Sequence, residues 1–211
     1  MSNEIMKKDT GSVALFGDDL QKGFENMTQE DMALPFVRIL GQLSPQVTDG
    51  DAKYIDGAKP GMIYNTVTSE CFDGKKGIKV IPCYYKKDYP EWSDRGDGPG
   101  APVAVHLPNS PVIQTGKRDG SKIRLPNGNY LEETASYYVL VETKAGGMTP
   151  ALISMKSTQL NVSKKWNSMM KTIQISDGKG GMAIPPMHGV VYNLQSVLQK
   201  NDKGSWYGWS V

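Results

Sequence analysis

Hydrophobic and polar residues follow patterns that predict short β-strands over most of this chain. The clearest strand is 136–143, where aromatic and β-branched residues dominate. Ala145-Gly146-Gly147 interrupts it, and the pattern resumes at 150–155, which is typical of a β-hairpin. Asn127-Gly128 lies between the short segments 122–125 and 129–131 and predicts a second hairpin.

Further strands are expected on both sides of these hairpins. Pro82 predicts an edge position or a bulge, because proline has no backbone N–H to donate to a neighbouring strand. Tyr84 and Tyr85 must then face opposite sides of their strand. The remaining strands are expected at 33–43, 61–67, 78–85, 190–198 and 206–211.

One segment has the periodicity of a helix instead. Val162, Trp166, Met169 and Ile173 recur on a single helical face, which places Trp166 in the core. Ser157 or Thr158 is expected to cap the N-terminus of this helix.

Many strands with one late helix predict a mainly β protein with a single inserted helix. An OB-like Greek-key barrel, elaborated by long loops, is the leading architecture. A β-sandwich stays open as an alternative, because the pattern does not determine which strands pair. Residues 1–30 are expected to form a flexible acidic N-terminal arm, 31–211 a single OB-like nucleic-acid-binding domain, and 93–111 a long loop.

The charge is unevenly distributed along the chain. Residues 1–60 contain ten acidic and six basic residues, whereas 61–211 contain twelve acidic and eighteen basic ones. The basic excess in the main body suits a polyanionic partner.

Motifs for catalysis or cofactor binding are missing from the sequence. His106 and His188 have no acidic residue close by in the sequence that suggests a proton relay. The sequence has no GxxxxGK[ST] phosphate loop, and its two cysteines lack zinc-ligand spacing. We therefore expect a non-enzyme without metal or cofactor.

Two absences bear on the compartment. No run approaches about 18 consecutive apolar residues, so neither a membrane span nor a membrane partner is expected. Residues 1–19 lack the apolar core of a signal peptide. The expected location is the cytoplasm, which is the host cytoplasm for a viral protein.

Aromatic residues mixed with lysines provide the main functional signal. Residues 75–92 contain five lysines and four aromatic residues. Lysines can follow a phosphate backbone while flat rings stack on unpaired bases, so this mixture is typical of single-strand binders. Tyr89 and Trp92 are expected in the loop after the strand, where their rings are free to stack. The candidate nucleic-acid-binding residues are Lys76, Lys79, Tyr84, Lys86, Lys87, Tyr89, Trp92, Lys117, Arg118, Lys122, Arg124, Lys164 and Lys165.

Each part of this set has a plainer interpretation. The rings of 84–92 are also compatible with core packing, and the lysines with protection of a strand edge. The basic turn at 117–124 is also typical of an exposed hairpin. Lys164 and Lys165 lie away from the apolar helix face, which favours a solvated role.

Several short motifs follow one another across 33–211: a Leu-Pro strand with Ser-Pro, a Pro-Gly-Met-Ile strand, Lys-Val-Ile-Pro-Cys-Tyr-Tyr before a Trp, a Ser-Lys-Lys-Trp helix and a closing Gly-Ser-Trp-Tyr strand. This order of motifs resembles phage-encoded single-stranded DNA-binding proteins used in replication and recombination. It implies an OB-type groove for single-stranded DNA, with replication or recombination proteins as further partners.

The chain departs from this pattern at its end. Many such proteins carry an acidic C-terminal tail that recruits partners, whereas this sequence ends in Trp-Tyr-Gly-Trp-Ser-Val. Recruitment of partners by that route is therefore not expected, and the acidic N-terminal arm stays open as an alternative. A viral assembly protein that does not bind nucleic acid stays open as the alternative function, and a homo-oligomer is compatible with either.

Overall fold

The computed structural model of this protein describes residues 24–94, 101–202 and 204–211. Leu34–Val211 forms one compact unit, and Met1–Ala33 is a separate one. Residues 24–33 are the described part of the smaller unit. There, the Asp31 carboxylate accepts hydrogen bonds from the backbone N–H and the hydroxyl of Thr28, beside the short η2 (Gln29–Asp31). Most of the predicted N-terminal arm, residues 1–23, lies outside the described residues.

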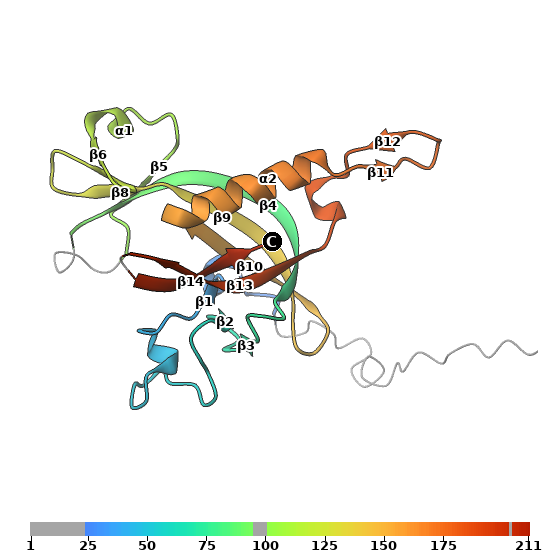
Figure 1. Cartoon of the computed structure of the whole chain (residues 1–211), viewed down its shortest axis with the longest axis horizontal. Coiled ribbons are helices and arrows are strands. Elements are labelled where there is room, and N and C mark those ends of the chain that lie inside the picture. The colour runs from blue at the N-terminus through green and yellow to red at the C-terminus, as the bar shows by residue number, and fades with distance from the viewer. Residues whose placement is uncertain (1–23, 95–100, 203) are drawn as a thin grey trace, which may run out of the picture. The chain divides into compact units, whose positions relative to one another are not determined.

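The protein is mainly β with one long helix, as the sequence predicts (Figure 1). The first strands are β1 (Val37–Ile39), β2 (Ile63–Asn65), β3 (Cys71–Phe72), β4 (Ile78–Trp92) and β5 (Ala104–His106). The middle of the chain forms α1 (Val112–Thr115), β6 (Lys117–Asp119), β7 (Lys122–Arg124), β8 (Tyr130–Glu132), β9 (Thr134–Glu142) and β10 (Met148–Lys156). After α2 (Leu160–Thr172) follow β11 (Ile175–Ser176), β12 (Met182–Ala183), β13 (Tyr192–Asn201) and β14 (Gly204–Ser210). The short 3-10 turns of this unit are η3 (Pro45–Val47), η4 (Ser157–Gln159) and η5 (Met187–Gly189).

The long bent strand β4 organises the largest sheet (Figure 1). Its first residues pair with β13, its middle with β9, and its end with β5 and β8. β10 pairs with β9, β14 with β13, and β6, β7 and β8 form a small meander beyond the end of β4. β1, β2 and β3 form a separate three-stranded sheet.

A β-bulge divides β4 at the position that Pro82 predicts. Val80 pairs with Val141, whereas Tyr84 pairs with Tyr138, so Cys83 is an extra residue in the ladder. A bulge shifts the alternation of side chains by one residue. Pro82 and Tyr85 therefore both face the core, while Tyr84 is exposed, which confirms the opposite orientations of the two tyrosines.

The main core forms between the sheet and α2. Trp166 of α2 is completely buried and stacks on Tyr137 of β9 with ring centroids 4.3 Å apart. The Tyr137 hydroxyl contacts Ser163 Oγ at 2.7 Å and donates to Asn167 Oδ1 at 2.9 Å. These contacts confirm the predicted core role of Trp166. The predicted capping by Ser157 or Thr158 is wrong, because η4 occupies this position and α2 follows it without a side-chain cap.

The closed barrel is also wrong, because the sheets are open. β14 pairs only with β13, and β10 pairs only with β9 among the named strands of the described chain. At one point, Pro35 and Phe36 contact the free edge of β10. There, Phe36 bridges Leu152, and the Leu152 N–H donates to the Pro35 carbonyl at 2.7 Å. The Leu152 N–H is therefore already hydrogen-bonded and is not available for pairing of β10 with β14.

Two loops contain more structure than the sequence predicts. The 93–111 loop includes β5, which pairs with Tyr89–Glu91 of β4, while its residues 95–100 are outside the described chain. The glycine-rich segment after α2 is the turn of the β11–β12 hairpin (Figure 1). No helix in the described ranges has the length and apolar character needed to cross a membrane.

Candidate nucleic-acid interface

The nine-stranded sheet has one face that is not packed against α2. Ala135 and Tyr137 of β9 belong to the core with Trp166, so the alternate residues Ser136 and Tyr138 face the other way. We call this second side the open face. Register places the following residues on it: Lys79, Ile81, Tyr84, Lys86, Asp88, Pro90 and Trp92 of β4, Thr134, Ser136 and Tyr138 of β9, and Leu152, Ser154 and Lys156 of β10.

A groove of about 800 Å³ lies along the open face. Its lining includes four polar residues of the sheet that are each less than a tenth exposed, namely Asp88, Glu132, Thr134 and Ser136. The aromatic and basic residues that line it are Phe36, Arg38, Trp92, Tyr138, Lys156, Tyr207 and Trp209. The groove thus combines flat rings, cations and hydrogen-bonding groups, which are the components that an unpaired nucleic-acid strand requires.

Tyr84 and Tyr138 form an exposed aromatic pair on this face. Their side chains are opposite each other across β4 and β9, with ring centroids 5.7 Å apart and ring planes inclined by 53°. Tyr84 is 59% exposed and Tyr138 38% exposed. Large exposed rings on a sheet face are available for stacking by a ligand.

Two lysines on this side of the sheet form ion pairs with acidic residues of the groove. Lys156 Nζ donates to Glu132 Oε2 at 2.6 Å, and Lys86 Nζ lies 3.0 Å from Asp88 Oδ2. The hydrogen bond to Asp88 raises the pKa of Lys86, because it stabilises the charged form of the lysine. Arg38 has no carboxylate partner within ion-pair distance in the described part of the chain, which leaves the cations in slight excess.

The open face continues into the basic meander at the end of β4. Trp92 is opposite Tyr130 of β8, and Tyr130 is opposite Arg124 of β7. Lys122 Nζ lies 3.5 Å from the Tyr130 ring centroid, and the Arg124 guanidinium lies 5.4 Å from it. A basic and aromatic surface therefore follows directly on the groove.

The structure divides the thirteen predicted site residues among several places. Those on the open face and its continuation are Lys79, Tyr84, Lys86, Trp92, Lys117, Lys122 and Arg124. Lys87, Tyr89 and Arg118 face the opposite side of their strands, Lys76 lies in the turn before β4, and Lys164 and Lys165 are exposed on α2. The sheet register thus brings together seven of the thirteen.

Two predictions about the aromatic residues need correction. Tyr89 and Trp92 belong to β4 rather than to a following loop, because β5 and β8 extend the pairing of this strand to its end. Tyr89 is only 9% exposed and packs in a second core cluster with Ile123 and Leu131, so its ring is not free to stack. Trp92 is partly buried and lines the groove.

Comparison with known proteins places the chain in a phage family. The model of the family described as Pam3 phage gp34-like protein matches residues 7–211. The chain belongs to this family. No curated protein and no solved structure matches it.

This Pam3 gp34-like chain has groove residues that sequence reasoning missed. Phe36 and Arg38 come from a segment at least forty residues before β4, and the Arg38 guanidinium lies 5.2 Å from the Phe36 ring. Alternation gave a usable signal for Tyr138, because its neighbour Tyr137 had to face the core. No sequence pattern predicts that Lys156 lines the groove, because its position there depends on which strand β10 pairs with.

The gp34-like fold also pairs an acid with a histidine that lies fifteen residues away in the sequence. His106 Nε2 lies 2.7 Å from Glu91 Oε2, and Glu91 Oε1 accepts hydrogen bonds from the amides of Asn127 and Asn129. These bonds, with that from Asn129 the strongest, lower the pKa of Glu91. In the described chain, the contact with Glu91 is the one hydrogen bond of the His106 ring. Glu91 therefore connects β5, through His106, and the β7–β8 turn, through Asn127 and Asn129, to β4. No nucleophilic side chain of the described residues is hydrogen-bonded to this histidine.

Proposed function

We propose that the protein binds single-stranded DNA without catalysis and without sequence specificity, protecting it during phage replication and recombination. The observation that carries this proposal is the groove on the open face. It gathers aromatic rings and cations from strands that are distant in the sequence.

The energetics of the groove fit this role. Each base stacked on an aromatic ring contributes about 1–3 kcal/mol whatever its identity, and each lysine–phosphate contact adds a salt-dependent contribution. Tyr138 and Arg38 line the groove, and Tyr84 and Lys86 lie on the same face of the sheet. An acidic floor at Asp88 and Glu132 favours a strand whose bases face the sheet and whose phosphates lie outward.

The order of strand pairing supports a partly open OB-type arrangement. β4 pairs with both β9 and β13, β10 follows β9, and α2 lies between β10 and the β13–β14 hairpin. OB-folds bind oligonucleotides on the face of their second and third strands, which correspond here to β9 and β10. The groove lies along these two strands.

Within this proposal the protein acts in the host cytoplasm. Its partners are single-stranded DNA and proteins of replication or recombination.

The test is a titration with oligo-dT at two salt concentrations, followed by tryptophan fluorescence. We expect quenching at low salt, because Trp92 and Trp209 line the groove, and weaker binding at high salt. Tyr138→Ala is expected to weaken binding by about 5- to 150-fold, which corresponds to one lost stacking contact. Tyr54→Ala removes a tyrosine of similar exposure from a loop and is the matched control.

Two results would count against the proposal. Absence of quenching and of a mobility shift at low salt would exclude binding. An oligomer in size-exclusion chromatography that is indifferent to the oligonucleotide would favour an assembly protein instead.

A further inference from the structure

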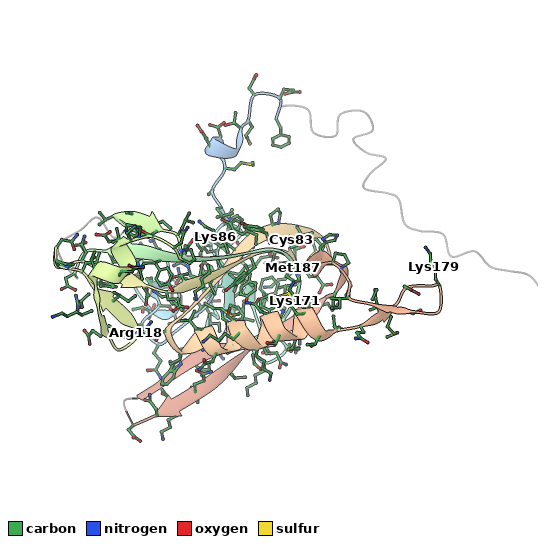
Figure 2. All side chains as sticks on the ribbon, turned by 90° about the horizontal axis from the view of Figure 1, so that it is seen from above. Cys83, Lys86, Arg118, Lys171, Lys179 and Met187 are labelled. Atoms are coloured by element: carbon green, nitrogen blue, oxygen red, sulfur yellow. The ribbon has the colours of Figure 1, made fainter. Side chains whose placement is uncertain are left out.

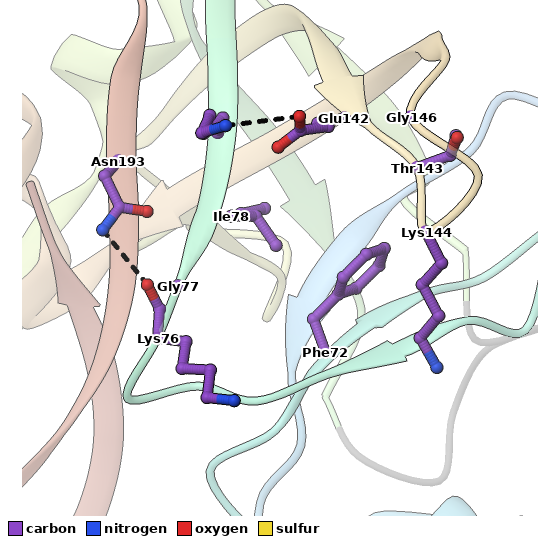
Figure 3. A pocket seen from close by; sticks show the side chains of 10 residues that line it. Phe72, Lys76, Gly77, Ile78, Glu142, Thr143, Lys144, Gly146 and Asn193 are labelled. Atoms are coloured by element: carbon purple, nitrogen blue, oxygen red, sulfur yellow. Dashed lines mark hydrogen bonds and ion pairs between the residues drawn. The ribbon is translucent and has the colours of Figure 1, made fainter.

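A second pocket lies at the other end of β4, away from the groove. It has a volume of about 580 Å³ and is lined by the turn before β4, the β9–β10 turn and β13 (Figure 3). Lys76, Lys79 and Lys144 line it together with the Phe72 ring and one acid, Glu142. Lys79 pairs with Glu142 at 3.3 Å, so the other two lysines are left without a carboxylate partner within ion-pair distance in the described residues.

The turn that carries Lys76 is held in place by several contacts. Asp73 accepts hydrogen bonds from the backbone N–H groups of Lys75 and Lys76, at 2.8 and 3.4 Å. Asn193 Nδ2 donates to the Lys76 carbonyl at 3.1 Å. Gly77 has a φ of +79° and is so close to β13 that a Cβ would lie 2.5 Å from the Leu194 carbonyl oxygen. The backbone of this turn is therefore well defined.

Phe72 stands between the two unpaired lysines (Figure 3). Lys144 Nζ lies 5.9 Å from the Phe72 ring centroid, and the ring is partly buried against the core. The Lys144 backbone N–H donates to Glu70 Oε1 at 3.1 Å, which positions the lysine at this end of the sheet. A flat ring flanked by two ammonium groups matches one nucleotide, with the base on the ring and phosphates on the lysines.

The open face connects this pocket with the groove. Lys79 lines the pocket and Asp88 lines the groove, and the face between them carries the Tyr84–Tyr138 pair. The nine residue steps from Lys79 to Asp88 span at most about 30 Å, the length of a fully extended strand. At a stacked spacing of about 3.4 Å per nucleotide, about nine nucleotides would cover this distance.

We propose that the Lys76–Lys144 pocket is a second contact site for the same single strand that occupies the groove. This inference rests on the proposed function and adds a direction to it, because the strand then runs lengthwise along β4. Phosphates bind Lys76 and Lys144, and a base packs against Phe72.

The test compares long and short oligo-dT on the double variant Lys76→Ala/Lys144→Ala. For an oligo-dT of about 20 nucleotides, we expect roughly tenfold weaker binding at low salt and a salt slope smaller by about 1.4, or 0.7 for each lost phosphate contact. An oligo-dT of about 4 nucleotides, too short to reach both sites, is expected to bind the groove with less than about twofold change. Lys171→Ala/Lys179→Ala removes the same charge from α2 and the β11–β12 turn and is expected to change neither (Figure 2).

The outcomes separate this inference from the proposed function. Unchanged binding of the long oligonucleotide by the Lys76→Ala/Lys144→Ala variant overturns the second site, and so does an equal loss for both lengths. If the Tyr138→Ala variant also binds the long oligonucleotide normally, the groove proposal fails as well. Loss of long-strand binding in the Lys171→Ala/Lys179→Ala control would show that net charge, rather than a site, determines affinity.

Discussion

Lys86 and Lys87 offer a sharp test of which face of the sheet binds DNA. They are adjacent in β4, and each lysine side chain is 36% exposed. Each also pairs with one carboxylate, Lys86 with Asp88 and Lys87 with Glu133, and these hydrogen bonds raise both lysine pKa values. They differ mainly in that Lys86 is on the open face and Lys87 on the opposite one.

Alanine substitution at these two positions should therefore separate binding from stability. Each variant loses an ion pair whose lysine is partly exposed, worth up to about 1 kcal/mol, and Lys86→Ala also leaves the nearly buried Asp88 carboxylate unpaired, so its free energy of unfolding should fall at least as far as that of Lys87→Ala. In a titration with oligo-dT at several salt concentrations, Lys86→Ala should reduce the slope of log Kobs against log salt by about 0.7, the value for one phosphate contact on a single strand. Lys87→Ala should leave the slope unchanged.

One complication is that Lys86→Ala leaves Asp88, which is 7% exposed, without its cation on the groove floor. This carboxylate could repel phosphates by itself. The double variant Lys86→Ala/Asp88→Asn removes both charges and distinguishes the two causes. A slope that stays about 0.7 lower assigns the effect to a lost lysine contact, whereas return to the wild-type slope assigns it to Asp88. Equal losses in Lys86→Ala and Lys87→Ala would refute the face assignment.

The remaining predictions concern stability. Tyr137→Phe should lower the free energy of unfolding by about 1–3 kcal/mol in urea, because the buried hydroxyl bonds Ser163 and Asn167. Burial raises the pKa of Tyr137 to about 12, above its unfolded value of about 10, so its contribution is complete below about pH 10 and is lost as the pH rises through about 12. The advantage of the wild type over Tyr137→Phe should thus shrink above about pH 10, and an advantage that grows would contradict this reasoning. In thermal unfolding, Gly77→Ala should lower the melting temperature more than Gly146→Ala. Both glycines have a positive φ, which costs an alanine about 1–2 kcal/mol, but only at Gly77 would the added Cβ meet other atoms. Equal costs would show that φ alone decides.

The bulge at Cys83 determines which residues of β4 lie on the open face. In a regular strand Pro82 and Tyr84 would face the same side, and Tyr84 would enter the core beside Tyr137. The extra residue turns Tyr84 outward, and Lys86 and Trp92 follow it at alternate positions. One inserted residue thus places Tyr84, Lys86 and Trp92, rather than Tyr85, Lys87 and Tyr89, on the same face as Lys79.

The sequence by itself determined the local elements of this protein. The Asn127-Gly128 hairpin, the 136–155 hairpin and the helix around Trp166 each depend on residues close together in the chain, where turn geometry and periodicity act directly. Their predictions are confirmed by the structure. The same local reasoning anticipated the irregularity at Pro82.

Only the tertiary structure decided the open sheet and the groove. Phe36 reaches the edge of β10 from more than one hundred residues away, and this contact helps to leave β10 unpaired with β14. The sequence predicts a free loop at Tyr89, because no local pattern indicates that β5 pairs with this part of β4. The physical reason is that strand pairing joins residues far apart in the chain, and local side-chain patterns do not encode which edges will meet.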